Sequence, residues 1–146
     1  MLTIIGVGIV MSVLSFYSQN IDVRKAESEV LTNKILGCLV SQGKINQDFF
    51  QEDFDIFKNC SLDKDIINEF GVYFMNITVE GKKSVVYGSI TFEKDCDIEE
   101  TVASAEYFPR CTLRELIVLD KDNNELKLRI RAGSNYRGGN LYGKTN

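Results

Sequence analysis

The first 21 residues contain no charged side chain, whereas residues 22–146 are polar. Within that stretch the run Leu2–Tyr17 is almost continuously apolar. A soluble domain that folds by itself does not need an apolar segment of this kind. We therefore expect residues 1–21 to attach the chain to a membrane or to other copies, and residues 22–146 to form a globular head.

The apolar segment is compatible with a membrane anchor. A helix needs about 20 apolar residues to cross a bilayer, and about 17 to 21 are present. A secretory signal peptide would begin with Lys or Arg and end in a small-residue cleavage site, and this segment has neither. The positive-inside rule would place Arg24 and Lys25 in the cytoplasm, which conflicts with disulfide bonds. A short basic leader, removed ahead of Met1, would resolve this conflict, so we expect a mature chain that keeps the segment.

Small residues recur within the segment at helical spacing. Gly8, Ser12 and Ser15 stand at i, i+4 and i+7, which is one face of a helix. Small residues on one face let helix backbones approach closely. One interpretation is an ordinary lipid-facing anchor, and the other is a helix that packs against its own copies. In the second case the packing residues are Leu2, Ile4, Ile5, Gly8, Ile9, Ser12, Val13, Ser15 and Phe16.

The pattern predicts one continuous helix of about 40 residues, near 60 Å long, that ends at Gly43. Its second half, residues 22–42, is predicted to be amphipathic. The outward side would carry Arg24, Lys25, Glu27, Glu29 and Lys34. The stripe expected to pack on a domain consists of Val23, Ala26, Val30, Leu31, Ile35, Cys38 and Leu39.

The remaining elements predict an α+β head. A short helix is expected over residues 46–59, with Asn46 as its N-cap. Hairpins are expected over 72–92 and 113–131, because strand-like runs flank turn sequences there. The amphipathic helix would cover one face of an antiparallel sheet of about four strands. An irregular acidic loop over 94–109 and a flexible tail over 133–146 complete this prediction.

Four cysteines are present, without a CxxC pair, and the chain has no histidine. We favour the sequential pairing, Cys38–Cys60 and Cys96–Cys111, because each bond closes a modest loop. The alternative is four reduced thiols in the core of a cytosolic protein. A zinc site is disfavoured, because short paired spacings and histidine ligands are both missing.

Charge and composition argue against several function classes. The net charge of −4 disfavours nucleic acid as a partner. Without histidine there is no Ser-His-Asp or Cys-His machinery, and no P-loop or dinucleotide motif occurs. The acidic run 95–100 lacks the glycine of a calcium loop, so we interpret it as solvated. We therefore expect no enzyme activity, no metal and no cofactor.

Two further features concern partners. Residues 44–106 hold 14 acidic and 6 basic side chains, whereas residues 110–146 hold 4 and 8. This uneven charge distribution either has no function, with the charges solvated, or lets the basic end of one copy contact the acidic middle of the next. Two N-x-[ST] sequons make Asn76 and Asn59 candidate N-glycosylation sites. Asn76 is the better candidate, because Asn59 is next to a bonded cysteine.

An apolar N-terminal run followed by an amphipathic helix and an antiparallel sheet resembles the type IV pilin superfamily. The resemblance covers 1–39 and the order of elements. Bacterial pilins usually open with an aromatic residue and have glutamate at the fifth position, where this chain has Met1 and Ile5. The chain therefore looks more like an archaeal pilin or pilin-like surface protein. The resemblance implies that the N-terminal segments are stored in the membrane and then bundle into the core of a filament.

Three hypotheses follow. The first is a structural subunit of an extracellular pilus-like helical filament that polymerises through its N-terminal apolar helix and serves adhesion or surface attachment. The second is an exported, membrane-anchored module that binds a ligand and stays monomeric. The third is a cytosolic enzyme with a buried N-terminal helix, which we disfavour. The apolar segment and its small-residue face favour the first.

Overall fold

The computed structural model describes residues 9, 22–68, 71–101 and 107–136. In these ranges a helix of 16 residues is followed by a six-stranded sheet and several shorter helices. The elements are α2 (Arg24–Leu39), β1 (Val40–Ser41), β2 (Lys44–Ile45), η1 (Gln47–Phe50), α3 (Ile56–Asn59), α4 (Lys64–Asn68), β3 (Tyr73–Val79), β4 (Lys83–Gly88), α5 (Thr91–Thr101), β5 (Arg110–Leu119) and β6 (Glu125–Ser134).

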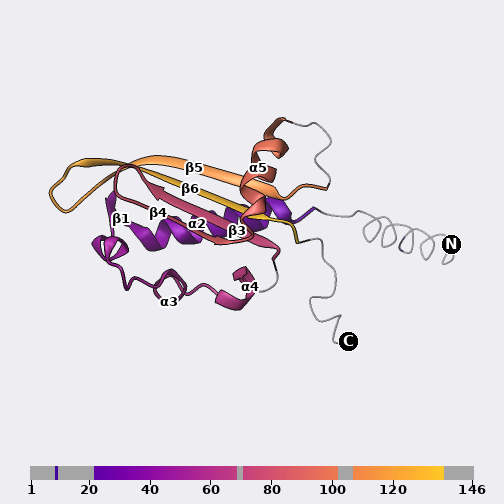
Figure 1. Ribbon diagram of the computed structural model, residues 1–146, viewed down its shortest axis with the longest axis horizontal. Helices are drawn as coiled ribbons and strands as arrows, with labels where there is room; N and C mark the ends of the chain where they lie inside the picture. Colours follow the sequence, from indigo (N-terminus) through magenta and orange to yellow (C-terminus); the bar gives the residue numbers. More distant parts are fainter. Residues whose placement is uncertain (1–8, 10–21, 69–70, 102–106, 137–146) are drawn as a thin grey trace.

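The sheet is mixed, with strand order β1-β2-β5-β6-β3-β4, and Figure 1 shows the long strands β5 and β6 side by side. β5, β6, β3 and β4 pair antiparallel, and β6 lies between β5 and β3. β2 joins this group through a parallel contact at Lys44 and Leu119. β1 pairs antiparallel with β2 at the edge. The long strands β5 and β6 therefore form the middle of the sheet.

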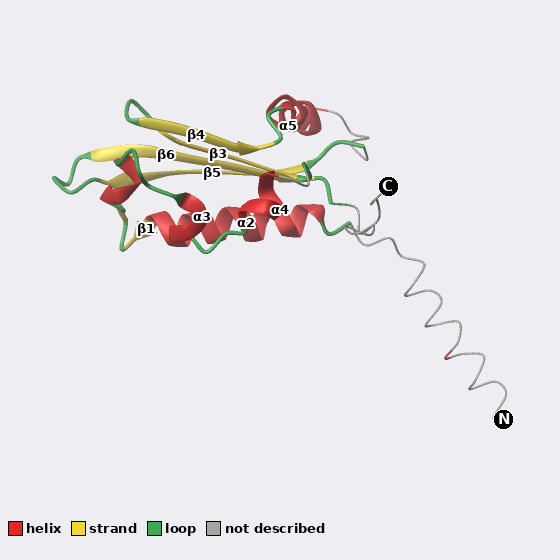
Figure 2. Ribbon diagram, turned by 60° about the horizontal axis from the view of Figure 1, so that its bottom comes forward, coloured by secondary structure: helices red, strands yellow, loops and turns green. Residues whose placement is uncertain are grey.

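The two faces of the sheet are covered unequally. α2 packs along one face, mainly on β5 and β6, and α3 and α4 lie on the same side (Figure 2). α5 lies on the opposite face, at one end, where it contacts β5 and β3. We call this second face the open face, because α5 covers only part of it.

The side of α2 that faces the sheet changes character along its length. Near the C-terminal end Ile35 and Leu39 are fully buried. They belong to the main core, which also holds the inward side chains Met75, Ile77, Val118, Leu128 and Ile130. Near the N-terminal end the buried residues are Arg24, Ser28 and Thr32. Hydrogen bonds therefore replace apolar contacts over the first half of this helix.

The predicted fold class is wrong. The described residues contain a helix of 16 residues and a mixed sheet of six strands, not a long helix on an antiparallel sheet of about four. α2 ends at Leu39 because Val40 is extended, with φ −122° and ψ 122°. Gln42 and Gly43, with φ of 50° and 78°, then turn the chain between β1 and β2. The first half of the expected helix, residues 1–8 and 10–21, lies outside the described residues.

The predicted apolar stripe is confirmed in the C-terminal half of α2 and wrong in its N-terminal half: Ile35 and Leu39 are buried, and Leu31 and Cys38 pack against the main core, whereas Val23, Ala26 and Val30 are exposed. Arg24, expected to face outward, is 5% exposed, whereas Val30, expected to be buried, is 67% exposed. Periodicity counts only apolar residues, so it places the buried side of a helix wrongly where that side is polar. The register is instead set by hydrogen bonds to β5, which no local pattern reveals.

Other segments differ in detail from their predictions. Residues 46–59 form two short helical turns, η1 and α3, instead of one helix, although Asn46 does accept a hydrogen bond from the Asp48 backbone N–H at 3.0 Å. The stretch 91–101, expected to be strand and then loop, is the helix α5. Residues 133 and 134, assigned to the tail, are the end of β6.

Both predicted disulfides are confirmed. Cys38–Cys60 ties the C-terminal end of α2 to the residue after α3, and Cys96–Cys111 ties α5 to β5. Each bond lies in apolar surroundings, the first in the main core and the second beside Phe74 and Phe92. The second staples the short helix α5 to the open face.

We expect each disulfide to contribute about 3 kcal/mol to the free energy of unfolding, because the closed loops span 22 and 15 residues. Urea unfolding of two double variants, Cys38→Ser with Cys60→Ser and Cys96→Ser with Cys111→Ser, measures this contribution. As a control, the unmodified chain should weigh about 4 Da less before reduction than after, since each disulfide lacks two hydrogens. Four free thiols in that measurement would contradict both bonds.

Candidate functional site

The described head meets residues 1–21 at the first turn of α2, and a buried guanidinium organises this point. Arg24 donates from Nε and Nη2 to the two carboxylate oxygens of Asp22, both at 2.8 Å. It also donates to the Phe108 carbonyl at 2.8 Å and to Asn135 Oδ1 at 3.3 Å. Arg24 thus connects the start of α2 with the segments before β5 and after β6. We call these residues, together with Arg110, the N-terminal junction.

Arg110 extends the junction to α5. Its Nε lies 3.3 Å from Asp22 Oδ2, and its Nη1 donates to Glu99 Oε1 at 2.9 Å. The hydrogen bond with Glu99 raises the pKa of Arg110, and that with Asp22 adds to the effect. Hydrogen bonds from Arg24 hold the pKa of Asp22 well below its usual range. Charge-assisted bonds of this kind are short and directional.

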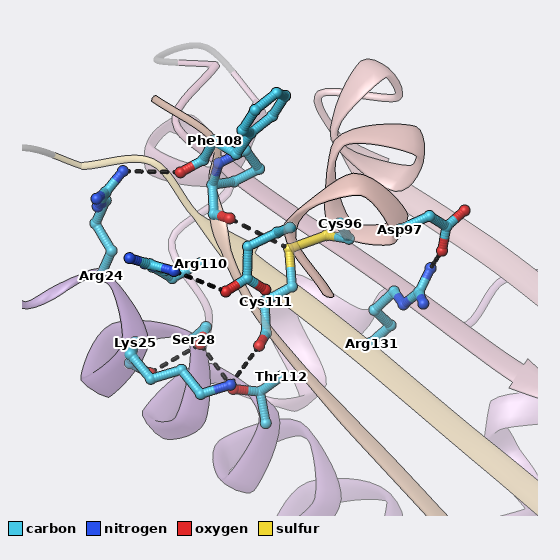
Figure 3. Close-up of a disulfide and its surroundings, with 12 residues drawn as sticks. Arg24, Lys25, Ser28, Cys96, Asp97, Phe108, Arg110, Cys111, Thr112 and Arg131 are labelled. Carbon is cyan, nitrogen blue, oxygen red and sulfur yellow. Dashed lines mark hydrogen bonds and ion pairs between the residues drawn. A yellow bond between two sulfur atoms is a disulfide. The ribbon is translucent and has the colours of Figure 1, made fainter. Parts of the chain in front are cut away.

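The next turn of α2 binds directly to β5. Lys25 Nζ donates to the Cys111 carbonyl at 2.5 Å. The hydroxyls of Ser28 and Thr112 are 2.7 Å apart, and both residues are buried. Figure 3 shows how these side chains from α2 and β5 gather beside the disulfide of Cys111. The helix is therefore fixed in both rotation and position along the strand.

The Cys96–Cys111 disulfide approaches β6 closely at Gly133. A Cβ at this position would lie 3.1 Å from Cys111 Sγ and 3.5 Å from Cys96 Sγ. On the other side of the sheet, Ser134 donates to Glu27 Oε2 at 2.5 Å. β6 is thereby held between α5 and α2, and its small residues at 133 and 134 permit both contacts.

The charged groups of the N-terminal junction are already engaged within the head. The carboxylates and cations are paired with one another or with backbone carbonyls. Within the described ranges, no group of three or more His, Cys, Asp or Glu side chains is placed to hold a metal ion. The junction fixes the position of Asp22, the residue at which the described head begins.

The predicted packing residues lie largely outside the described part. Only Ile9 is described, as a helical residue that is 61% exposed. The other eight, Leu2, Ile4, Ile5, Gly8, Ser12, Val13, Ser15 and Phe16, fall in the ranges that the structure does not describe. Their role therefore stays a prediction.

The two sequons differ in exposure, and which of them carries a glycan stays a prediction. Asn76 lies on the open face, is partly buried, and donates from Nδ2 to Glu93 Oε1 at 2.9 Å. The Thr78 hydroxyl also donates to Asn76 Oδ1 at 3.0 Å. Asn59 is exposed at the end of α3, although its Nδ2 donates to the Asp55 carbonyl at 2.7 Å. Asn59 is thus the more accessible acceptor.

Charged residues on the open face are paired within the chain. Arg131 donates to Asp97 on α5 at 2.7 Å, and Glu115 pairs with Arg129 at 2.6 Å and with Lys127 at 3.4 Å. The hydrogen bond from Arg129 lowers the pKa of Glu115. Arg131–Asp97, together with Arg110–Glu99, joins the basic end to the acidic middle inside one head, whereas Glu115, Lys127 and Arg129 all belong to the basic end.

Sequence reasoning missed the junction, because its members are far apart along the chain. Asp22 and Arg24 were visible as a close charged pair, but nothing local pointed to Phe108 or Asn135. One sequence feature does point to the junction: an arginine lies at the boundary between a charge-free segment and a helix. That signal alone would not have indicated burial.

The pKa of Asp22 predicts the pH dependence of the junction. Because the folded value lies below the ordinary 3.8, the ionised carboxylate stabilises the fold fully above about pH 4. This contribution is lost as the pH falls through the lower folded value. We expect Asp22→Asn to reduce the free energy of unfolding at pH 7 by about 1 kcal/mol or less, because solvent screens this partly exposed group.

Unfolding at pH 7, 4 and 2.5 tests this, with the exposed Asp53→Asn as the matched control. The difference between Asp22→Asn and the unsubstituted chain should shrink in acid, while the control should match the unsubstituted chain throughout. A difference that grows in acid would contradict the assigned sign.

Two further findings concern membrane-spanning helices and similarity to known proteins. Within the described ranges, no helix combines the length and the apolar character needed to cross a membrane. Comparisons with protein-family models, curated proteins and solved structures give no match to this chain.

Proposed function

We propose that this chain is a subunit of an extracellular, pilus-like helical filament, which polymerises through its apolar N-terminal segment and serves adhesion or surface attachment. Before assembly, the same segment holds the chain in the membrane. The partner in the assembled state is therefore a second copy of the chain. Nucleic acid, metals and cofactors have no part in the proposal.

The observation that carries this proposal is the position of the junction. Twenty-one residues without a charge lead directly to Asp22, whose carboxylate is held by Arg24 and Arg110. A head that is only anchored to lipid does not need its first residue to be held by two guanidinium groups. A filament subunit does, because each head must keep a fixed orientation relative to the shared core.

The chemistry of the segment supports assembly. Apolar side chains are removed from water equally well by lipid or by other apolar segments. Full burial of a single Ile or Leu is worth about 1.5–3 kcal/mol, so Leu2–Tyr17 supplies a large driving force. A head-to-tail contact between different surfaces of successive copies produces an open filament when the rotation does not close.

The disulfides support an extracellular location. Two bonds and no free cysteine are present, and such bonds persist in oxidising compartments. They also support a structural role, because covalent links that limit unfolding suit a protein exposed outside the cell. Exposed Asn59 would permit a glycan on the head.

A second candidate function is an anchored, monomeric module that binds a ligand. A hollow of about 470 Å³ on the open face favours it. Its lining is mostly polar, and it comprises Asn76, Thr78, Glu93, Asp97, Leu113, Arg129 and Arg131. Because most of these groups are bonded to one another, a ligand would have to replace existing contacts. We therefore place this function second.

Removal of detergent from the purified full-length chain tests the proposal. We expect filaments by negative-stain microscopy, and we expect Ile9→Asp to raise the concentration needed for assembly at least about a hundredfold. A buried carboxylate there would lose apolar contact and leave a charge without water. The matched control is Ile90→Asp, since Ile90 is 72% exposed on the head beside α5.

The control should assemble like the unsubstituted chain. An unsubstituted chain that stays dispersed in detergent-free buffer would contradict the filament. Monomers that remain soluble only in detergent would favour the anchored module.

A further inference from the structure

We infer that a groove between α2 and α4 receives the apolar segment Leu2–Tyr17 of a second copy of this chain. The inference deepens the proposed function and depends on it. It names the surface of the head that contacts the filament core.

The groove has a volume of about 540 Å³ and lies between α2 and α4, beside Tyr73 of β3. α2, the turn before α4, α4 itself and β3 all contribute to its lining. The principal apolar residues of that lining are Val23, Ala26, Val30, Leu62, Ile66 and Tyr73.

The groove follows from the polar packing of α2. Because Arg24, Ser28 and Thr32 occupy the buried side of the helix, the apolar residues Val23, Ala26 and Val30 are left exposed. Val30 is 67% exposed, and Ile66 and Val23 are exposed by 39% and 38%. Adjacent apolar side chains left open to water in this way mark an interaction surface.

The polar groups at the edge of the groove already have partners inside the head. Glu27 accepts a hydrogen bond from Ser134, and Lys34 Nζ donates to the Ser61 carbonyl at 2.6 Å. The Asp63 carboxylate accepts the backbone N–H groups of residues 65 and 66 at the start of α4. An uncharged apolar occupant would therefore leave no polar group at this edge without a hydrogen bond.

The segment Leu2–Tyr17 matches the groove in length and chemistry. Along α2, the groove runs from Val23 to Lys34, which is about 17 Å at 1.5 Å per residue. Coiled as a helix, Leu2–Tyr17 would measure about 24 Å, which is enough to cover it. The segment carries no charge and so brings no unpaired ion to an apolar surface.

A second copy suits the groove better than the chain's own segment. The chain enters the head at Asp22, which is held by Arg24 and Arg110, and the groove begins at the next residue. To fold back, the chain would have to reverse direction within residues 18–21. That reversal would have to be completed in four residues, Ser-Gln-Asn-Ile, whereas the segment of a neighbouring copy in the proposed filament needs no reversal to reach the groove.

Cross-linking between two differently tagged, full-length chains tests the occupant. One chain carries Val30→Cys, and the other carries Ile5→Cys, Ile9→Cys or Val13→Cys. All native cysteines are in disulfides, so each introduced thiol is the only free one. After co-assembly, a short bismaleimide should join the two tags for at least one of the three positions. Val86→Cys, on the open face, should give no such product.

Assembly of single variants provides the second measurement. We expect Val30→Asp to raise the concentration needed for filament formation about tenfold or more, because a carboxylate would replace a valine that the second copy covers in the filament. Val86→Asp, at a residue 39% exposed on the open face, should leave it unchanged. Far-ultraviolet circular dichroism and intact disulfides confirm that both variants are folded.

The outcomes separate this inference from the proposed function. Filaments without any cross-link at Val30, or with Val30→Asp assembling at the unsubstituted concentration, would overturn the groove and leave the filament intact. A further chain carries Val30→Cys together with one of the segment cysteines. If the bismaleimide links these two cysteines only within that one chain, the chain's own segment occupies the groove, and the second copy is overturned as occupant. If the unsubstituted chain forms no filaments, the proposed function fails, and the inference fails with it.

Discussion

The buried guanidinium of Arg24 is the interaction on which the rest of this head depends. Its bonds to Asp22, the Phe108 carbonyl and Asn135 bring together parts of the chain more than 80 residues apart. Removing one partner of such a buried group leaves the others without hydrogen bonds, which is costly. Once Arg24 occupies this position, the first half of α2 has to bury polar groups and expose apolar ones.

The sequence predicted those features that are encoded locally. The disulfide pairing followed from short loops between successive cysteines, and Asn46 was recognisable as a cap. The buried side of α2 was not predictable in the same way, because Ser28 and Thr32 are buried only through contacts that involve β5 and the helix itself. Strands of two residues, such as β1 and β2, are too short to show any periodicity.

The helix α5 illustrates a different limit. Its sequence is strongly acidic, and its buried residues are Phe92 and Cys96. A pattern with so few apolar positions resembles a solvated loop, and a covalent bond holds it on the sheet instead of a broad apolar face. Arg131 and Arg110 then pair with its carboxylates. Two contacts between the acidic middle and the basic end are therefore made within one folded unit.

The Cys38–Cys60 disulfide has a consequence for a chain pulled by its N-terminal end. Tension would pass along α2 and then through the sulfur–sulfur bond to Cys60, so residues 39–59 would carry none of it. Unravelling of α2 between Arg24 and Cys38 could lengthen the chain by about 28 Å, because each residue gains about 2 Å on extension. The β1–β2 turn and η1 would stay folded and bear no force while α2 unravelled.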